Sequence, residues 1–285
     1  MKFALDIPIT GEYSIDKVLT LAQDAENNNW DGFFLWDMIL DSRDSSINTL
    51  DPIVTLSAIA TCTKRMKIGL MLTPLVRRRP WKLARELITL DHLSKGRLIV
   101  GIGLGFNKEE FSKFGEESDP KIRAEKLDES LEILTKLLSG EKVNFKGTYY
   151  SVDNIQFNPL PYQKRHIPIW LGGFWPNKKP YRRGAKYDGM YPGMANPDPP
   201  GSVNISKQSV LRQIRDYISQ FRDNMQSFDL MHYGDISSDY EKEKLNLLEW
   251  EEAGLTWWAQ TNDYTSYEKH RERILAGPPK KPMKV

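Results

Sequence analysis

The sequence predicts an α/β fold, a single (β/α)8 barrel of the TIM type, and three observations lead to this fold class. Short β-rich runs alternate with helical stretches, which is typical of parallel strands with helices outside them. We count about eight such units, the number that closes a barrel. The 285 residues would suit two domains of about 150 residues each, but barrels of about 250 residues are routinely one domain. A doubly wound open sheet fits this count less well.

The first half of the chain alternates strand and helix from its start. Ser14 precedes apolar residues at helical spacing and is typical of an N-cap. Asp51 followed by Pro52 is a second helix start, a capping residue and then proline. The expected strands are residues 3–9, 32–37, 67–72 and 97–102, and the expected helices are about 14–27, 51–64 and 80–94.

The second half repeats this rhythm after one interruption. A long helix is expected over residues 120–139, followed by a small hairpin over 143–150 that turns at Gly147. The insertion after this fourth helix covers about residues 144–162 of a barrel domain spanning 1–277, and a loose basic tail follows at 278–285. Further strands are expected at 167–173, 189–191, 228–233 and 255–260, with helices at about 178–186, 206–222, 240–252 and 266–276.

Composition excludes several classes of protein. There are 40 Lys and Arg residues against 38 Asp and Glu, so bulk binding to nucleic acid or to an anionic membrane is not expected. The single cysteine, Cys62, cannot form an internal disulfide. No apolar run approaches the roughly 20 residues that span a bilayer, and Asp6 interrupts any signal-peptide core. We therefore expect a cytoplasmic protein. The eight tryptophans are unusual.

A barrel places its chemistry at the carboxyl ends of the strands and in the loops that follow them. The residues expected there are mostly aromatic and apolar, which suits a planar organic ligand, although the same side chains could simply be core. The four histidines are scattered, so no metal site is expected, and a metal-dependent hydrolase is disfavoured. These strand-end residues are Asp6, 36–38, 72–74, 103–107, 172–175, Tyr191, 232–233 and 258–260.

Two glycine motifs follow predicted strands. Gly101, Gly103 and Gly105 begin a dinucleotide-type spacing, but Phe106 stands at the third position of that motif. These glycines are therefore expected to let a ligand lie close to the strand end. Gly172-Gly173 is a better candidate anion cradle because a short helix follows it, and an ordinary tight turn is the alternative.

The run Arg77-Arg78-Arg79 is the densest basic segment. It follows the third strand, so it could reach a phosphate or an acidic substrate, or it could be a solvated loop.

The stretch from Pro80 to Gly103 carries a resemblance to a known family. A helix opens with proline, passes through Leu-Asp-His-Leu-Ser-Lys-Gly-Arg and leads into a strand ending in Gly-Ile-Gly. This run resembles the luciferase-like monooxygenases, and the resemblance extends from Met1 to about Met194. Matching segments elsewhere are Gly32-Phe33, Trp36-Asp37, Ile68-Gly69, Thr73-Pro74 and residues 167–173.

The resemblance implies a TIM barrel that binds FMN, or the deazaflavin F420, at its mouth. The ring is expected beside Met71, Leu72 and Thr73, at a bulge that often contains a non-prolyl cis peptide. The resemblance further implies ring contact by Asn107, a phosphate cradle at Gly172, Gly173 and Phe174, and catalytic residues Trp36 and Asp37 on the substrate side. Trp175, like Trp36 and Trp258, falls at a strand end where a planar cofactor needs walls.

One position departs from the family pattern. Many members have a histidine directly after the acidic residue of the second strand, and this chain has Met38. A thioether does not transfer protons. Asp37 could take over that role, or the reaction could proceed without such a base.

These observations leave three functions open. The first, which we favour from the sequence, is a monooxygenase that uses reduced FMN from a separate reductase, together with O2, on a small organic substrate. The second is an F420-dependent hydride-transfer enzyme, whose acidic cofactor tail would be attracted by residues 77–79, Lys178, Lys179, Arg182 and Arg183. The third is a non-catalytic flavin-binding barrel.

Two further expectations concern association and specificity. The resemblance implies a homodimer formed through the second and third helices. The helix from Asp51 is apolar nearly all round, which agrees with such an interface, and burial inside one protomer is the alternative. Specificity is expected in the loops at 106–120 and 192–206. The proline-rich segment from Pro192 to Gly201 would be a semi-rigid lid or a flexible loop.

Overall fold

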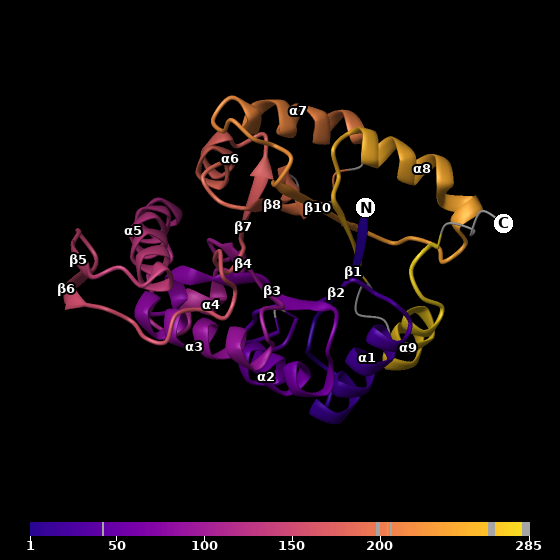
Figure 1. The fold of residues 1–285 in the computed structure, drawn as a ribbon, viewed down its shortest axis with the longest axis horizontal. Coiled ribbons are helices and arrows are strands. Elements are labelled where there is room, and N and C mark those ends of the chain that lie inside the picture. Colours follow the sequence, from indigo (N-terminus) through magenta and orange to yellow (C-terminus); the bar gives the residue numbers. More distant parts are fainter. Residues whose placement is uncertain (42, 198–199, 204, 206, 262–265, 281–285) are drawn as a thin grey trace.

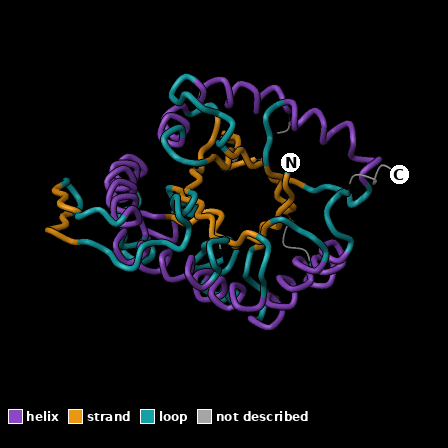
Figure 2. Tube along the Cα trace, viewed as in Figure 1, coloured by secondary structure: helices purple, strands orange, loops and turns teal. Residues whose placement is uncertain are grey.

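A computed structural model describes residues 1–41, 43–197, 200–203, 205, 207–261 and 266–280 of the chain. It consists of a ring of strands with helices outside the ring (Figures 1 and 2). The strands of the ring are β1 (Lys2–Ile7), β2 (Gly32–Leu35), β3 (Lys67–Pro74), β4 (Leu98–Gly103), β7 (Ile169–Trp175), β8 (Gly189–Pro197), β10 (Asp229–Gly234) and β11 (Trp257–Thr261).

These strands pair in parallel around the whole ring. Their order is β1-β2-β3-β4-β7-β8-β10-β11, and β11 pairs again with β1. The pairing between β8 and β10 closes the cylinder through Asp229 opposite Gly189 and Leu230 opposite Met190. The predicted (β/α)8 barrel is confirmed. All carboxyl ends of its strands consequently lie at one end of the cylinder, which we call the mouth.

The helices cover the outside of the barrel and begin where the sequence predicts. The Ser14 side chain accepts a hydrogen bond from the Lys17 N–H, and Asp51 caps its helix through the Val54 N–H at 2.9 Å. The main helices are α1 (Ile15–Asn27), α2 (Pro52–Cys62), α3 (Pro80–Leu93), α5 (Pro120–Ser139), α6 (Lys178–Gly184), α7 (Gln208–Ser219), α8 (Tyr240–Glu252) and α9 (Tyr267–Leu275).

The expected hairpin lies between α5 and β7, at one edge of the molecule (Figure 1). It consists of the antiparallel strands β5 (Val143–Lys146) and β6 (Ser151–Ile155). Glu129 on α5 holds the turn, because its carboxylate accepts hydrogen bonds from the N–H groups of Thr148, Tyr149 and Tyr150 at 2.7–3.0 Å.

Three segments differ from expectation. The proline-rich segment after Tyr191 continues β8 as a strand and pairs antiparallel with β9 (Pro200–Val203); residues 198–199 lie outside the described part. The short elements η1 (Leu75–Arg77) and α4 (Glu109–Ser112) were not predicted. Finally, Pro278 and Pro279 at the start of the expected loose tail are buried, and residues 281–285 lie outside the described part.

The inside of the barrel is filled by aromatic rings. Phe34, Trp170 and Trp257 contact one another with ring centroids 5.6–5.9 Å apart. Ala4, Met231 and Ala259 belong to the same buried cluster. A larger cluster fills the space between the barrel and the helices. The barrel is therefore a packed core below its mouth, and two of the eight tryptophans, Trp170 and Trp257, belong to this core.

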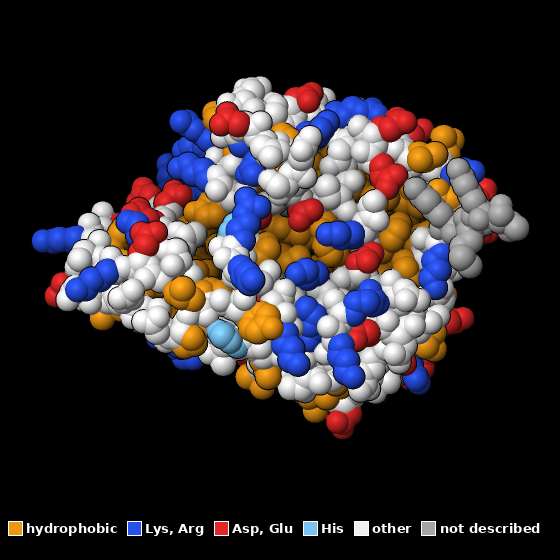
Figure 3. Space-filling view, viewed as in Figure 1, with side chains coloured by type: hydrophobic (Ala, Val, Ile, Leu, Met, Phe, Trp, Pro, Cys, Tyr) orange, Lys and Arg blue, Asp and Glu red, His pale blue; other side chains and the backbone are white. Residues whose placement is uncertain are grey.

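The surface view in Figure 3 shows basic and acidic side chains interspersed around a hollow with apolar side chains at its centre. In the part of the chain that the structure describes, no helix has both the length and the apolar character needed to cross a membrane.

Candidate functional site

The floor of the mouth is built by side chains that point into the barrel at the ends of its strands. Side chains alternate along a strand, so Asp6 lies on the same face of β1 as the inward-facing Ala4. Leu72, Tyr191 and Tyr233 pack against the same inner cluster from β3, β8 and β10. The Tyr191 and Tyr233 rings are stacked, with centroids 5.3 Å apart and planes 13° from parallel.

The bulge that the resemblance implies is present in β3. The Met71–Leu72 peptide bond is cis, and the pairing of β3 with β4 shifts between Leu70 and Thr73. Met71 is buried inside the barrel, Leu72 is half-buried at the mouth, and Thr73 is fully buried.

Glycines of the neighbouring strands make room for Leu72. A Cβ on Gly101 would lie 2.7 Å from a Leu72 methyl carbon, and one on Gly172 would lie 2.2 Å from the other. Gly101 was expected to let a ligand lie close to the strand end, and Gly172 was expected to belong to an anion cradle. In the structure Leu70, Met71 and Leu72 all approach Gly101, and Leu72 approaches Gly172. Leu72 therefore forms part of the floor on which a ligand would lie.

The predicted catalytic residue Asp37 lies just beyond β2, and its side chain is 1% exposed. Arg77 donates to Oδ1 at 2.6 Å, and Arg78 donates to both carboxylate oxygens at 2.8–3.1 Å. The Thr73 hydroxyl donates to Oδ2. Asp37 is thus held by two guanidinium groups and one hydroxyl, an arrangement that fixes the orientation of its side chain and of the loop after β2.

The same network includes Glu110 on α4, which the sequence analysis did not identify. Glu110 is 4% exposed, pairs with Arg77 and accepts a hydrogen bond from the Ile39 N–H at 2.7 Å. The first two residues of the arginine run therefore form buried ion pairs at the rim, whereas Arg79 is exposed. We call Asp37, Thr73, Arg77, Arg78 and Glu110 the rim network.

Asp6 has a different environment on the barrel axis. It is 1% exposed, and its Oδ2 accepts a hydrogen bond from the Tyr191 hydroxyl at 2.5 Å. Burial raises the pKa of Asp6 to about 7, although polar contacts with Tyr191 and with the predicted catalytic residue Trp36 act to lower it. The same burial, together with the neighbouring carboxyl group, raises the pKa of Tyr191 well above 10. Asp6 and Tyr191 both stood among the strand-end residues, but sequence separation hid their contact.

Asn107, expected to contact a cofactor ring, offers a hydrogen-bond donor. Its Oδ1 accepts from the Glu109 N–H at 3.0 Å. Its Nδ2 is buried and has no hydrogen-bond partner among the described residues. A buried amide donor without a partner is costly, so this group is suited to a ligand acceptor.

The predicted phosphate cradle lies where β7 separates from β4. In the described strands, the β4–β7 pairing ends at Ile102 opposite Leu171, whereas β7 remains paired with β8 as far as Trp175. The β7 edge that faces β4 is therefore open from Gly172 onward. Gly173 has a packing role as well, because a Cβ there would lie 2.6 Å from Pro180 Cβ on α6. Phe174 is half-buried and contacts the exposed Phe106 edge to face.

Two of the three predicted aromatic walls face the helix layer instead. Trp175 packs edge to face on Tyr181 of α6, with the Lys178 ammonium group 3.4 Å from its ring centroid. Trp258 packs near Trp250 of α8. The prediction that these two rings line the mouth is not supported, because alternation along β7 and β11 turns them outward. Of the three, Trp36 is the ring that lies beside Asp6.

His232 is also turned outward. It stacks on Trp250 with centroids 4.3 Å apart, and burial lowers its pKa to about 4.

The basic side chains of α6 contact neighbouring segments on the outside of the barrel. Arg183 pairs with Asp128 of α5 at 2.5 Å, and the Arg182 guanidinium lies 5.5 Å from the Phe221 ring centroid. Both cations are therefore engaged at the outside of the barrel.

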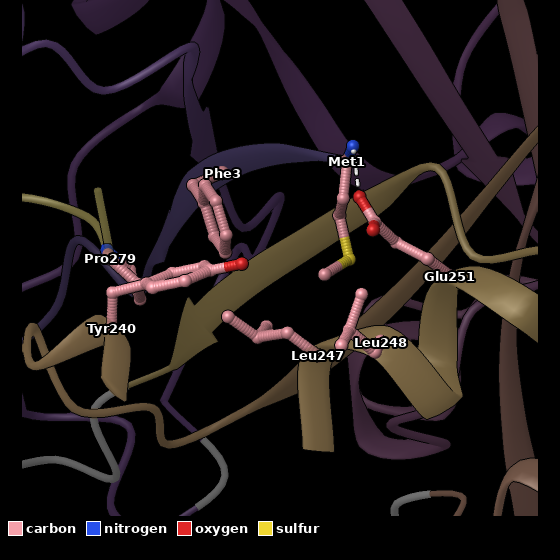
Figure 4. Close-up of a pocket in the computed structure, with 7 residues that line it drawn as sticks. All are labelled: Met1, Phe3, Tyr240, Leu247, Leu248, Glu251 and Pro279. Atoms are coloured by element: carbon pink, nitrogen blue, oxygen red, sulfur yellow. Dashed lines mark hydrogen bonds and ion pairs between the residues drawn. The ribbon is translucent and has the colours of Figure 1, made fainter. Parts of the chain in front are cut away.

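Within the described ranges, no three His, Cys, Asp or Glu side chains are grouped so that they could hold a metal ion. A cavity of about 290 Å³ lies at the opposite end of the barrel from the mouth, between the start of β1 and α8 (Figure 4). Phe3, Leu247 and Leu248 contribute to its mostly apolar lining, and the Met1 amino group pairs with Glu251 at its edge. A smaller cavity of about 170 Å³ lies beside residues 76–79.

Comparison with known proteins identifies the relatives of this chain. The family model for luciferase-like monooxygenases matches residues 3–207. An F420-dependent glucose-6-phosphate dehydrogenase from Microbacterium testaceum is 30% identical over 166 residues, which are 58% of this chain and 49% of that protein. The chain spans about half the length of the curated relatives it matches.

Solved structures share the fold over almost the whole chain. The F420-dependent tetrahydromethanopterin reductase from Methanopyrus kandleri superposes with a TM-score of 0.74 at 17% identity and covers 98% of both chains. A monooxygenase from Streptomyces bottropensis gives a TM-score of 0.72 at 18% identity over 96% of both chains. At these identities the likeness concerns the fold.

Proposed function

The chain belongs to the luciferase-like monooxygenase family, and from this premise we propose that it is an oxidoreductase that binds a flavin-type ring, F420 or FMN, in the barrel mouth. The observation that carries this proposal is the set of groups around the mouth. They comprise the buried Asn107 Nδ2 donor, the open edge of β7 from Gly172 onward, and a floor formed by Leu72 and the stacked tyrosines.

These groups fit the cofactor class. The pyrimidine edge of a flavin or deazaflavin carries carbonyl acceptors, which suit the Asn107 amide. The phosphate of the side chain suits backbone N–H groups along the open edge of β7. The ring would lie on Leu72, beside the bulge of β3. In this arrangement Trp36 and Asp6 lie on the side of the mouth left for substrate.

Of the two cofactors, we favour F420 and hydride transfer. Three of the relatives matched by sequence are F420-dependent glucose-6-phosphate dehydrogenases, at 28–32% identity. An FMN-dependent monooxygenase that works with a separate reductase is the second candidate, and the similarity to limonene 1,2-monooxygenase of Rhodococcus erythropolis, 32% identical over 111 residues, favours it.

The residues of the mouth would bind, orient and shield. The bound cofactor supplies acceptance or donation of a hydride, or activation of O2 in the FMN case. The rim network would hold the loops after β2 and β3 in position, with Asp37 orienting the loop through its two arginines. The aromatic floor would exclude water from the reacting atoms. Met38 leaves proton transfer to another group.

The cofactor is tested by titrating the purified full chain with F420, FMN and reduced FMN and following ring fluorescence or absorbance. We expect micromolar or tighter binding of F420 and a weaker Kd for it in Asn107→Ala. Tight binding of reduced FMN with O2 consumption would establish the second candidate. Binding without turnover across a substrate panel would support the non-catalytic barrel, and binding of neither cofactor would refute the proposal.

We also propose a homodimer that uses α2. Its inner face buries Leu56 and Ile59, whereas Val54 on the other face is 68% exposed. A second protomer would cover this apolar side chain. Light scattering should give twice the 33.0 kDa mass of the chain, and Val54→Asp should shift it toward the monomer. A monomeric wild type would refute the dimer.

A further inference from the structure

The proton-handling group of the mouth is not assigned by any of the comparisons, and Met38 does not supply it. Among the carboxyl groups that end the barrel strands, Asp37 is paired with Arg77 and Arg78. Asp6 has no basic side chain among its hydrogen-bond partners in the described structure. The two groups are therefore not equivalent candidates.

The two carboxylate oxygens of Asp6 differ in their hydrogen bonds. Oδ2 accepts a hydrogen bond from the Tyr191 hydroxyl. Oδ1 is buried and has no hydrogen-bond partner among the described residues. Tyr191 is itself fixed by stacking on Tyr233. Trp36 makes a further polar contact with the carboxyl group, which lies at the carboxyl end of β1, where barrel enzymes place their chemistry.

The surroundings of Asp6 favour exchange of a proton near neutral pH. The titratable groups that face it are Tyr191 on β8 and, behind that ring, Tyr233 on β10; Trp36 after β2 adds a polar contact without charge. Burial dominates and raises the pKa of Asp6 to about 7. A general acid or base works best when its pKa lies near the operating pH.

We propose that the Asp6 carboxyl group, held by the Tyr191 hydroxyl, exchanges a proton through Oδ1 with a substrate that alternates between a hydroxyl and a carbonyl group. This assignment rests on the proposed oxidoreductase function and deepens it. It gives Asp6 the part that a histidine at position 38 would otherwise play. Tyr191 is a positioning residue.

The step balances with the cofactor as the hydride partner. In oxidation, the C–H bond of the substrate breaks and its electron pair leaves as hydride to the oxidised cofactor. The O–H bond breaks, and its proton goes to Asp6 Oδ1. The carbon–oxygen double bond forms from the electrons of that O–H bond. In reduction, protonated Asp6 returns the proton to the carbonyl oxygen as hydride arrives at carbon.

The first test observes Asp6 directly and needs no substrate. Carbon-13 NMR of the full chain labelled at aspartate carboxyl carbons, titrated from pH 4 to 9, should contain a resonance with a midpoint near 7 that is missing in Asp6→Asn. Addition of F420 or FMN should shift this resonance. A midpoint near 4, or no response to a cofactor that binds, would overturn the proposal.

The second test separates binding from proton transfer. Asp6→Asn should bind the cofactor with a Kd within about threefold of wild type, yet oxidise the best substrate among 2-propanol, cyclohexanol and glucose 6-phosphate at least 100-fold more slowly. The turnover rate of Asp6→Asn should no longer change with pH around pH 7, where the wild-type rate does. Tyr191→Phe should shift the midpoint of this pH dependence but keep the dependence itself.

Asp229→Asn is the matched control. Asp229 is a carboxyl group whose pKa burial also raises, but it begins β10 at the other end of the barrel, so this variant should keep wild-type turnover. Wild-type activity in Asp6→Asn would overturn the Asp6 assignment alone. A wild type that binds cofactor but oxidises none of the three compounds would overturn the hydroxyl-substrate class. A wild type that binds neither cofactor would overturn the oxidoreductase function as well.

Discussion

Asp6 and Asp37 lie at the ends of adjacent strands, and both are almost fully buried at 1% and 4% exposure. Their partners differ completely. Asp37 is enclosed by Arg77, Arg78 and Thr73, whereas Asp6 has a phenol and an indole beside it. Burial by itself therefore does not define the role of a carboxylate. The charge of its neighbours decides whether it holds the structure together or exchanges a proton.

The largest expected effect comes from removing the charge of Asp37. Asp37→Asn leaves two largely buried guanidinium groups without their main counter-charge, and a broken buried pair typically costs about 3–5 kcal/mol. We expect a large fall in the urea midpoint. Asp128→Asn, which removes the partner of Arg183 at a 60% exposed side chain, is the control and should change the midpoint little. Equal effects in the two variants would refute the structural role of the rim network.

Replacing the Asp6 carboxyl group with an amide should instead stabilise the folded protein. Between its unfolded value near 4 and its folded pKa of about 7, the native state binds more protons than the unfolded state, so wild-type stability falls as pH rises through this window. Asp6→Asn escapes this loss. The free energy of unfolding of Asp6→Asn minus that of wild type should increase by about 1.4 kcal/mol per pH unit between the two pKa values. The total increase should be at most about 4 kcal/mol, and the difference should stay constant above pH 8. Urea unfolding at pH 4.5, 6 and 8 measures it; an advantage independent of pH would contradict the prediction.

A smaller effect is expected at Glu110, which shares Arg77 with Asp37. Glu110→Gln keeps an oxygen for the Ile39 N–H and leaves Arg77 one carboxylate partner. The cost should be about 1–3 kcal/mol in unfolding experiments, less than that of Asp37→Asn. A larger cost would mean that Glu110, rather than Asp37, is the principal counter-charge of the rim network.

The smallest effect is expected at Tyr191, where the phenol contributes one hydrogen bond to the Asp6 carboxylate. Tyr191→Phe removes an interaction that lowers the pKa of Asp6. The NMR midpoint of Asp6 should therefore rise, by about one pH unit. A fall of the midpoint would show that the Tyr191 hydroxyl stabilises the protonated carboxyl group.

The fold could be predicted from the sequence because its signals are local. Capping by Ser14 and Asp51, and the alternation of strands with helices, depend on residues close together in the chain. The same alternation placed the candidate residues at the mouth. The sequence contains no such local signal for β9. Its segment is rich in proline, which is unfavourable in strands, and its strand character depends on pairing with β8.

The assignment of roles within the site could not be predicted in this way. Tyr191 and Asp6 are 185 residues apart, and neither neighbouring sequence indicates that they meet. Trp175 and Trp258 point either into or out of the barrel according to which residues of their strand face inward. A shift of one residue in this alternation reverses the direction of each side chain. The arginine run is evident in the sequence. The sequence does not indicate that Arg77 and Arg78 pair with Asp37 while Arg79 is exposed.

The closure of the barrel between β8 and β10 has a mechanical consequence. The described backbone pairing there is confined to two neighbouring positions on each strand, whereas β7 and β8 stay paired from Trp170 to Trp175. Above this short seam, the stacked rings of Tyr191 and Tyr233 bridge the two strands. Near the mouth, the contact between these two rings therefore takes the place of backbone pairing between β8 and β10. Since Tyr191 also holds Asp6, any widening of the rim moves the hydroxyl that orients the carboxyl group.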